Sequence, residues 1–411
     1  MTPRPIKILS KPRLREAWRE SRDSSPNAGR PGIDNVTALR FAANLDHNIT
    51  ILARGLRQGT YGPAPLRAVF IPKPNSDNER MICIPTVADR VVQRAAVAYL
   101  TKNEKLPIYN SSSFGFLRDR GTRAAISAAV AHRRSYDWCL KTDIESFFDR
   151  IPRQYLKSCV ARALGEHSLV PIVSKVIDCE IKLTRWNRPT IEKHGVQLGV
   201  GVRQGMPLSP ILANLVLSEF DSKIERYGLK MVRYADDIAI FFESKQKAKE
   251  GHKLVKDMLA SIELTIPELT DNSKTQLLGP SDPIDFLGRE IVRIGTDNSV
   301  VSRVARKQIN KIVRKLEDEY TLQSRMKADS NFQETVVEIW DSVSAYLAVY
   351  KDAYNYVSLD SALRATSGKI IGDIFLELFG EHALSNITTE GRRFLGMSHV
   401  DFGDPVNDFD T

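Results

Sequence analysis

The sequence predicts an α+β fold in which a mixed β-sheet backed by helices is followed by a helical C-terminal region. Short apolar runs with alternating side chains recur between residues 66 and 242, with helix-like stretches between them. After Gly288 the apolar residues recur at helical spacing instead. At 411 residues the chain is long enough for two or three domains with sizeable cores.

The N-terminal part is predicted to contain a basic extension, a hairpin and a long helix. Residues 1–60 read as the basic extension with short helices. Alternating residues at Leu66–Ile71 and Met81–Ile84, joined by a polar stretch, predict a β-hairpin. A helix is expected from about Val87 to Leu100, where several alanines permit close packing.

From Asp137 to Phe242 the pattern predicts a strand, a helix, a glycine-rich turn, a second helix and a hairpin. A first C-terminal helix is indicated by apolar residues at helical spacing, namely Ala305, Ile309, Ile312, Val313 and Leu316. Its other side is mostly basic, with Lys307, Lys311, Arg314 and Lys315. A second helix is expected over about Thr335–Tyr356. These patterns divide the chain into domains at 61–290 and 291–398, with an acidic tail at 399–411.

Composition limits the classes of protein to be considered. A net charge of +9 and a pI near 9.2 suit a polyanionic partner, although an ordinary soluble basic protein would also show them. The four cysteines form no CxxC pair, so they predict buried thiols in a reducing cytosol. No apolar run approaches the roughly 20 residues of a membrane span, and we expect a cytoplasmic protein with no membrane partner.

The chemistry is indicated most directly by Tyr234-Ala235-Asp236-Asp237 inside the apolar run Met231–Phe242. Adjacent carboxylates between two strand-forming halves are costly to hold together unless a divalent cation neutralises them. Asp143 ends an earlier apolar stretch, and a metal pair about 4 Å apart needs carboxylates from separate strands. The pattern predicts metal-assisted phosphoryl transfer. A plain hairpin turn is the alternative interpretation, because aspartate is common in turns.

Matching blocks occur in order over roughly residues 28 to 290, and together they resemble a reverse transcriptase of the bacterial, group II intron-like branch. The blocks are Gly32–Thr37, Phe70–Pro74, Ser113–Phe116, the Asp143 segment, Gly205–Pro210, the Tyr234–Asp237 box, Lys274-Thr275 and Phe286–Gly288. The resemblance implies a right-hand polymerase with fingers, palm and helical thumb. It implies RNA-templated DNA synthesis from deoxynucleoside triphosphates, with an RNA template and a DNA product as partners, and leaves room for a homo-oligomer or an accessory protein.

The resemblance also assigns the metal and nucleotide ligands. Asp143, Asp236 and Asp237 are the catalytic acids, and the carbonyl of Ile144 is a further oxygen donor for two Mg²⁺ ions. Because successive strand side chains point to opposite faces, Asp237 is expected to contribute mostly by charge. Lys274 matches a late palm lysine that would protonate the departing pyrophosphate, and a merely solvated lysine is the alternative.

Further residues match the nucleotide-binding positions of the family. Lys73 and Arg80, on the two arms of the hairpin, are expected to hold the triphosphate, and two exposed surface cations are the alternative. Phe148 matches the ring beneath the sugar that excludes a 2′-hydroxyl; core packing is the competing assignment, for which Phe147 suits better. Gln204 and Gly205 mark a tight loop near the templating pair, although the following residue, Met206, is larger than in many relatives.

Within this family, the motifs around Asp143 and Gly205 most resemble the free-standing, unclassified, defence-associated reverse transcriptases, which often copy a noncoding RNA. After Gly288 the sequence has room for a thumb and shows nothing like a Cys/His-rich endonuclease. Anti-phage defence is therefore expected by analogy. Template-independent or protein-primed DNA synthesis and a maturase-like RNA-binding role remain open alternatives. The sequence does not determine the template, the primer, the product or the oligomeric state.

Overall fold

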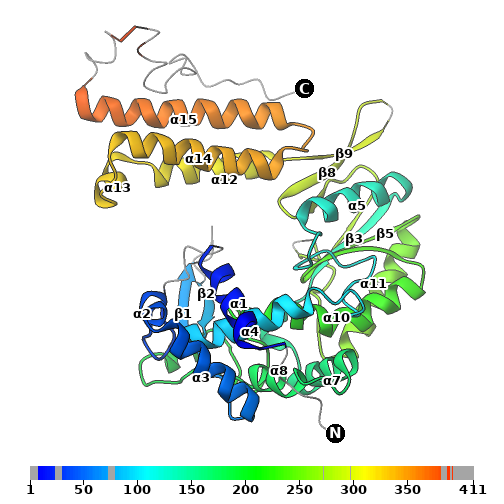
Figure 1. Cartoon of the computed structure of the whole chain (residues 1–411). Coiled ribbons are helices and arrows are strands. Elements are labelled where there is room, and N and C mark those ends of the chain that lie inside the picture. Colours follow the sequence, from blue (N-terminus) through cyan, green and yellow to red (C-terminus); the bar gives the residue numbers. More distant parts are fainter. Residues whose placement is uncertain are drawn as a thin grey trace. The chain divides into compact units, whose positions relative to one another are not determined.

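The computed structural model describes residues 8–23, 30–72, 79–271, 273–296, 298–380, 387–388 and 391. The chain forms two compact units, Met1–Gly279 and Pro280–Thr411 (Figure 1). Each unit combines helices with antiparallel strands, which confirms the predicted α+β class. The predicted functional boundaries at residues 60, 290 and 398 stay predictions, and the acidic tail at 399–411 lies outside the described residues.

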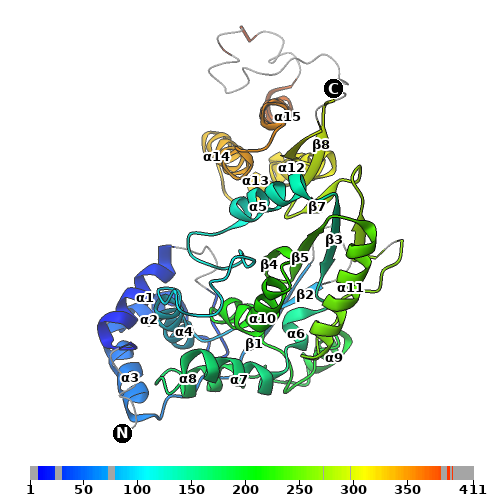
Figure 2. The ribbon, with the colours of Figure 1, turned by 90° about the vertical axis from the view of Figure 1, so that its right-hand side faces the viewer.

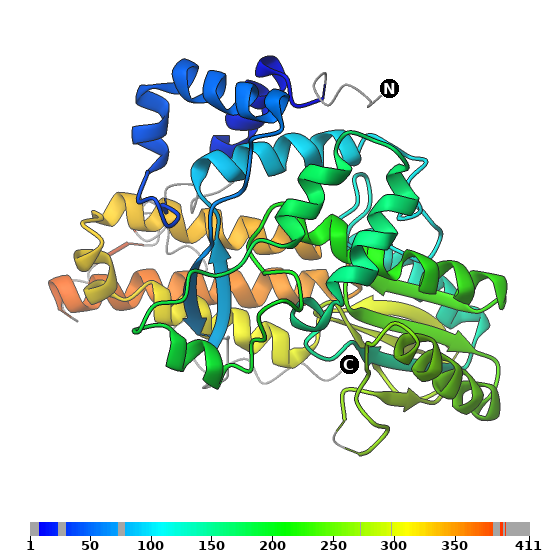
Figure 3. The same ribbon diagram turned by 90° about the horizontal axis from the view of Figure 1, so that it is seen from below.

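Four helices pack together in the N-terminal part of the first unit, as Figure 3 shows for the blue helices and their light-blue neighbour. They are α1 (Lys11–Asp23), α2 (Ala38–Ala43), α3 (Leu45–Gln58) and α4 (Val87–Leu100). Helix α4 has the predicted bounds. It begins after Thr86, whose hydroxyl accepts a hydrogen bond from the Asp89 backbone N–H at 3.1 Å and thereby caps the helix.

The predicted hairpin is confirmed. Strands β1 (Arg67–Pro72) and β2 (Glu79–Ile84) pair antiparallel, with Arg67 opposite Ile84 and Ile71 opposite Arg80. Residues 73–78, which connect the strands, lie outside the described residues, and Lys73 is among them.

The central sheet of the first unit has the strand order β4-β5-β3-β6, and all neighbouring strands are antiparallel. Figure 2 shows β4, β5 and β3 side by side. Its strands are β3 (Trp138–Asp143), β4 (Lys230–Tyr234), β5 (Asp237–Phe242) and β6 (Gln276–Leu278). The expected mixed pairing is reduced to an isolated parallel bridge between Ser113 and Arg233 at the β4 edge. Strand β5 is buried along almost its whole length because it lies inside the sheet and helices pack against it.

Three helices pack against this sheet, namely α5 (Thr122–Ser135), α10 (Ser209–Arg226) and α11 (Lys245–Ala260). Helix α11 lies along β3 and β5 (Figure 2). A glycine permits this approach, because a Cβ atom at Gly251 would lie only 2.2 Å from Cζ of Phe242. Helix α10 includes the predicted apolar segment Ile211–Phe220, and almost every residue of that segment is buried.

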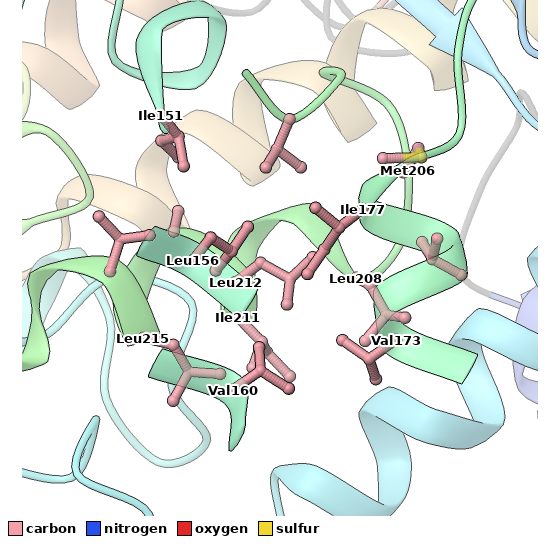
Figure 4. Packing of buried hydrophobic residues seen from close by; sticks show 14 of the residues in the cluster. Ile151, Leu156, Val160, Val173, Ile177, Met206, Leu208, Ile211, Leu212 and Leu215 are labelled. Atoms are coloured by element: carbon pink, nitrogen blue, oxygen red, sulfur yellow. The ribbon is translucent and has the colours of Figure 1, made fainter. Parts of the chain in front are cut away.

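A second layer of the same core lies where α10 meets α7 (Arg153–Leu164) and α8 (Val170–Ile177). Figure 4 shows Leu212 of α10 next to Leu156 of α7 and Ile177 of α8. The short helices α6 (Phe147–Arg150) and α9 (Arg188–Lys193) complete the first unit. Because the start of α10 is fixed in this core, the loop that precedes it has a fixed anchor.

The second unit has its own sheet and its own core. Its strands are β7 (Ile284–Phe286), β8 (Arg289–Ile294) and β9 (Ser299–Arg303), paired antiparallel in that order. Its helices are α12 (Arg306–Glu319), α13 (Leu322–Lys327), α14 (Phe332–Tyr350) and α15 (Tyr356–Phe379). Ile312, Leu316, Ile339, Val343, Leu359 and Leu363 form the centre of the core.

The predicted end of the C-terminal helix expected over about Thr335–Tyr356 is wrong, because α14 ends at Tyr350. The chain turns after Tyr350, and a further helix, α15, begins at Tyr356. The Asn355 side chain explains the break, because its oxygen accepts from the Val304 backbone N–H at 2.8 Å and its amide donates to the Val304 carbonyl at 3.0 Å. These bonds hold the turn against the end of β9.

All four cysteines are free and buried, as predicted. Burial raises the pKa of the thiols of Cys83, Cys139 and Cys179 to about 12. Within the described part of the chain, none of the helices combines the length and apolar character needed to cross a bilayer.

Candidate active site

The predicted acids lie at the hairpin between β4 and β5. Tyr234 pairs with Asp237, so Ala235 and Asp236 form a two-residue loop. Ala235 has a left-handed backbone with φ of 58° and is buried. For an L-residue this conformation costs about 1 kcal/mol, so contacts around the loop must hold it. The turn therefore coexists with the acidic site, and the two interpretations of this segment do not exclude each other.

The sheet brings the three acids together. Asp143, the last residue of β3, stands directly opposite Asp237, the first residue of β5. The backbone N–H of Ile144 donates to the carbonyl oxygen of Asp236 at 3.1 Å, which places Asp236 beside the end of β3. Like charges directly opposite each other on a sheet are destabilising, so this arrangement needs positive charge nearby.

Burial, together with this crowding, shifts the pKa values of two of the acids. Burial, with the charge of Asp143, raises the pKa of the Asp236 carboxyl, while the charges of Lys274 and Arg80 act against the rise. Burial also raises the pKa of Asp237, and Lys141 opposes that shift. Arg80 on β2 is thus close enough to Asp236 for its charge to be felt there.

Two lysines neutralise part of the acidic charge. Lys274 Nζ lies 2.5 Å from Oδ2 of Asp143, and Lys141 forms an ion pair with Asp237. In the described part of the chain, Asp236 is the one acid of the three that forms no ion pair. Sequence reasoning missed Lys141, although a lysine inside the apolar run before Asp143 was the available signal.

The ion pairs of the acids indicate which carboxylates could bind a divalent cation. Among the described residues, no group of three or more His, Cys, Asp and Glu side chains is placed to hold a metal ion. Lys141, which pairs with Asp237, is largely buried, whereas Lys274, which pairs with Asp143, is exposed and can turn away, so Asp143 and Asp236 are the carboxylates best placed for a shared ion. Two carboxylates with a backbone carbonyl such as that of Ile144 suit Mg²⁺, which keeps several of its waters.

The residues expected at the sugar lie on one connected loop system. Phe148 of α6 is half-buried, and its ring centroid lies 5.5 Å from that of Phe147. Phe147 is buried in the main core, as the sequence suggested. The carbonyl of Phe148 accepts from the Val202 backbone N–H at 2.7 Å, which connects α6 to the loop before α10.

The Gln204-Gly205 loop is hydrogen-bonded to the β1–β2 hairpin. The Gln204 carbonyl accepts from the Cys83 backbone N–H at 2.7 Å. Gly205 has φ of +102°, and a Cβ atom there would lie 2.5 Å from the Cys83 carbonyl oxygen. Both the backbone conformation and the close approach require glycine. The structure thus joins Gln204 and Gly205 to the strand that carries Arg80.

Comparison with known proteins identifies the family. The family described as reverse transcriptase (RNA-dependent DNA polymerase) matches residues 71–291, more than half of the chain. The chain therefore belongs to the reverse transcriptase family and is an RNA-directed DNA polymerase. The matched range contains all the site residues considered above.

Two curated relatives show the breadth of the similarity. The chain is 26% identical over 337 residues to protein YkfC of Escherichia coli K12, covering 70% of this chain and 82% of that protein. It is 28% identical over 210 residues to the group II intron-encoded protein LtrA of Lactococcus lactis, covering 51% of this chain and 33% of LtrA. The expected similarity to the group II intron-like branch is confirmed. The chain spans only about a third of the length of LtrA.

A solved structure of telomerase from Candida albicans, in complex with a fragment of telomeric RNA, aligns with 85% of this chain and 68% of that chain. The TM-score is 0.43 and the sequence identity 13%.

Proposed function

We propose that the chain copies RNA into DNA by metal-assisted phosphoryl transfer, with Asp143 and Asp236 as the principal ligands of two Mg²⁺ ions. The observation that carries the proposal is the placement of Asp236 beside Asp143 with no ion pair of its own in the described part of the chain. Bound there, the ions would activate the attacking 3′-hydroxyl and stabilise the departing pyrophosphate.

The remaining residues of the site are proposed to have the following roles. Lys274, held at 2.5 Å from Asp143, is proposed to give a proton to the pyrophosphate, and its exposed side chain can turn toward solvent and substrate. Lys141 engages Asp237, so Asp237 contributes charge to the site more than direct coordination. Phe148 is proposed to bound the sugar, with Gln204 and Gly205 on the adjoining loop.

The proposal is tested by nucleotide incorporation with purified protein and a primed RNA template. Incorporation of deoxynucleotides is expected with Mg²⁺, to be lost on chelation, and to return when Mg²⁺ is restored. RNA binding without incorporation would favour the maturase-like alternative. Incorporation that persists after the RNA is digested would favour template-independent synthesis, and product attached to protein would indicate protein priming.

Arg80 is proposed to contact the triphosphate, and Lys73 is proposed to join it. Replacing Arg80 by alanine should raise the nucleotide concentration at half-maximal rate roughly tenfold or more, since a hydrogen bond to a charged group is removed. Arg67→Ala is the matched control, because Arg67 is exposed at the opposite end of the same hairpin. The role is wrong if Arg80→Ala weakens RNA binding while nucleotide dependence stays as in the wild type.

The biological role is proposed to be defence against phage, with a noncoding RNA as template. Support comes from the motif resemblance around Asp143 and Gly205 and from the positive net charge of +9, which favours a polyanionic partner. The proposed site of action is the cytoplasm. A homo-oligomer or an accessory protein remains compatible with this role.

A further inference from the structure

Arg233, the residue before Tyr234 in β4, is a charged group in the interior of the first unit. Its side chain and that of Asp221 on α10 are both fully buried, and they form an ion pair. Burying a guanidinium is costly unless its donors are met, and a buried ion pair is not in itself evidence of stability. The pair lies next to the β4–β5 turn that carries Asp236, so a role in shaping that turn is to be considered.

All five N–H donors of Arg233 have acceptors. Nε and Nη2 donate to the two oxygens of Asp221, the first at 2.7 Å. Nη2 also donates to Oγ of Ser113 at 2.9 Å, and Nη1 donates to Oδ1 of Asn214 at 3.0 Å. The remaining Nη1 bond, at 2.9 Å, goes to the carbonyl oxygen of Ala235. The guanidinium therefore binds the strained residue of the turn itself.

Two of these acceptor residues, Asn214 and Asp221, are themselves hydrogen-bonded to the segment that precedes α5. The Asn214 amide donates to the Gly115 carbonyl at 2.8 Å, and the Asn110 amide donates to Oδ2 of Asp221 at 3.0 Å. A Cβ atom at Gly115 would lie 2.5 Å from the Ala235 backbone nitrogen. The network thus encloses the turn on the side away from β3.

We infer that Arg233 is a positioning residue for the proposed metal site. The bond from Arg233 to the Ala235 carbonyl and the bond from Ile144 to the Asp236 carbonyl hold successive peptide units of the turn from two sides. Together they keep Ala235 left-handed and Asp236 beside Asp143. The inference rests on the proposed function, because the position of Asp236 matters through the cation it would hold.

The chemistry explains why arginine is needed for this task. A lysine at position 233 could pair with Asp221 but has three donors on one atom and cannot serve acceptors on several sides. An apolar pair of similar volume could fill the space without charge, and such replacements are often neutral or stabilising. Neither alternative donates to the Ala235 carbonyl in the observed way.

The test uses the full chain and three variants, Arg233→Lys, the double variant Arg233→Met with Asp221→Leu, and Arg289→Lys. Arg289 is the matched control, because it is a buried arginine of the second unit paired with Asp352 at 2.6 Å. Three quantities are measured: the unfolding temperature, the binding of Mn²⁺ alone by its paramagnetic resonance signal, and the Mg²⁺ concentration at half-maximal incorporation.

Both Arg233 variants should need roughly tenfold more Mn²⁺ and Mg²⁺ for half-saturation, with RNA affinity unchanged. The double variant should do so while staying folded, with an unfolding temperature several degrees lower, because the buried acceptors of Asn214 and Ala235 lose their donor. Arg289→Lys should lower the unfolding temperature and leave the metal requirement unaltered. If the double variant does not fold, Arg233→Lys, which keeps a cation beside Asp221, carries the comparison with Arg289→Lys.

A folded Arg233 variant with wild-type Mn²⁺ affinity and wild-type Mg²⁺ dependence would overturn the inference. The inference would also be overturned if the metal concentration needed for half-saturation rose in all three variants in proportion to the fall in their unfolding temperature. Failure of the proposed function looks different: the wild type would bind Mn²⁺ but incorporate no nucleotide, and the Mn²⁺ comparison among variants would still report on Arg233.

Discussion

Asp143→Asn and Asp236→Asn are each expected to lower nucleotide incorporation by on the order of a thousandfold or more at saturating Mg²⁺. Asparagine keeps the shape of the side chain but removes the charge that would hold the cation, and the charge stabilisation supplied by a metal ion amounts to several kcal/mol. Asp237→Asn should have a smaller effect, because Asp237 is proposed to contribute charge more than direct coordination, and the largely buried Lys141 already offsets part of that charge. The rate of incorporation on a primed RNA template measures all three.

Folding provides the control for these variants. Burial raises the pKa of Asp236, so the charged carboxylate opposes folding at neutral pH relative to its exposed state in the unfolded chain. A neutral asparagine should therefore leave the unfolding temperature unchanged or raise it. Near wild-type incorporation by the Asp236 variant would refute the assignment of this acid.

The same variant separates the enzymatic role from the biological one. A cell that carries the gene with its flanking DNA should resist some phages, and Asp236→Asn should abolish the resistance if DNA synthesis is the defensive act. Equal protection by both forms would favour the alternative in which the protein acts by binding RNA.

Phe148→Ala should raise the use of ribonucleotides relative to deoxynucleotides by roughly tenfold to a hundredfold. The half-buried ring is proposed to occupy the space that a 2′-hydroxyl would need, and steric rejection of one hydroxyl is worth about that much. Competition between the two nucleotide types in single-turnover incorporation gives the ratio.

Phe147→Leu is the control for the Phe148 variant. Phe147 is buried in the core next to Phe148, so shortening it should lower the unfolding temperature without altering the choice of sugar. An unchanged ratio in the Phe148 variant would mean that another residue excludes ribonucleotides.

Local patterns were sufficient to predict much of this fold. Helix α4 has the predicted bounds because a cap and a run of alanine and valine define it locally. The two hairpins follow from alternation around a polar or acidic connection. The acids of the site were identifiable for the same reason, since Asp143 and Asp236 each stand at the end of a strand-forming run.

Long-range pairing accounts for what the sequence could not show. Arg233 meets Ser113 across 120 positions and Asp221 across 12, and no local rule selects those partners. The break before α15 likewise depends on Asn355 finding Val304 51 positions away. A charged residue within an apolar strand was the signal for Arg233, but it could not reveal which groups would satisfy it.

The burial of every native thiol makes this chain convenient for spectroscopic work. Burial raises the pKa of Cys83, Cys139 and Cys179 to about 12. The pKa of Cys159 is also raised by burial, so little thiolate is present near neutral pH. Maleimide dyes react through the thiolate, so cysteines introduced at exposed positions would be labelled selectively. One dye on each compact unit would let energy transfer report the distance between the units without first removing any native cysteine.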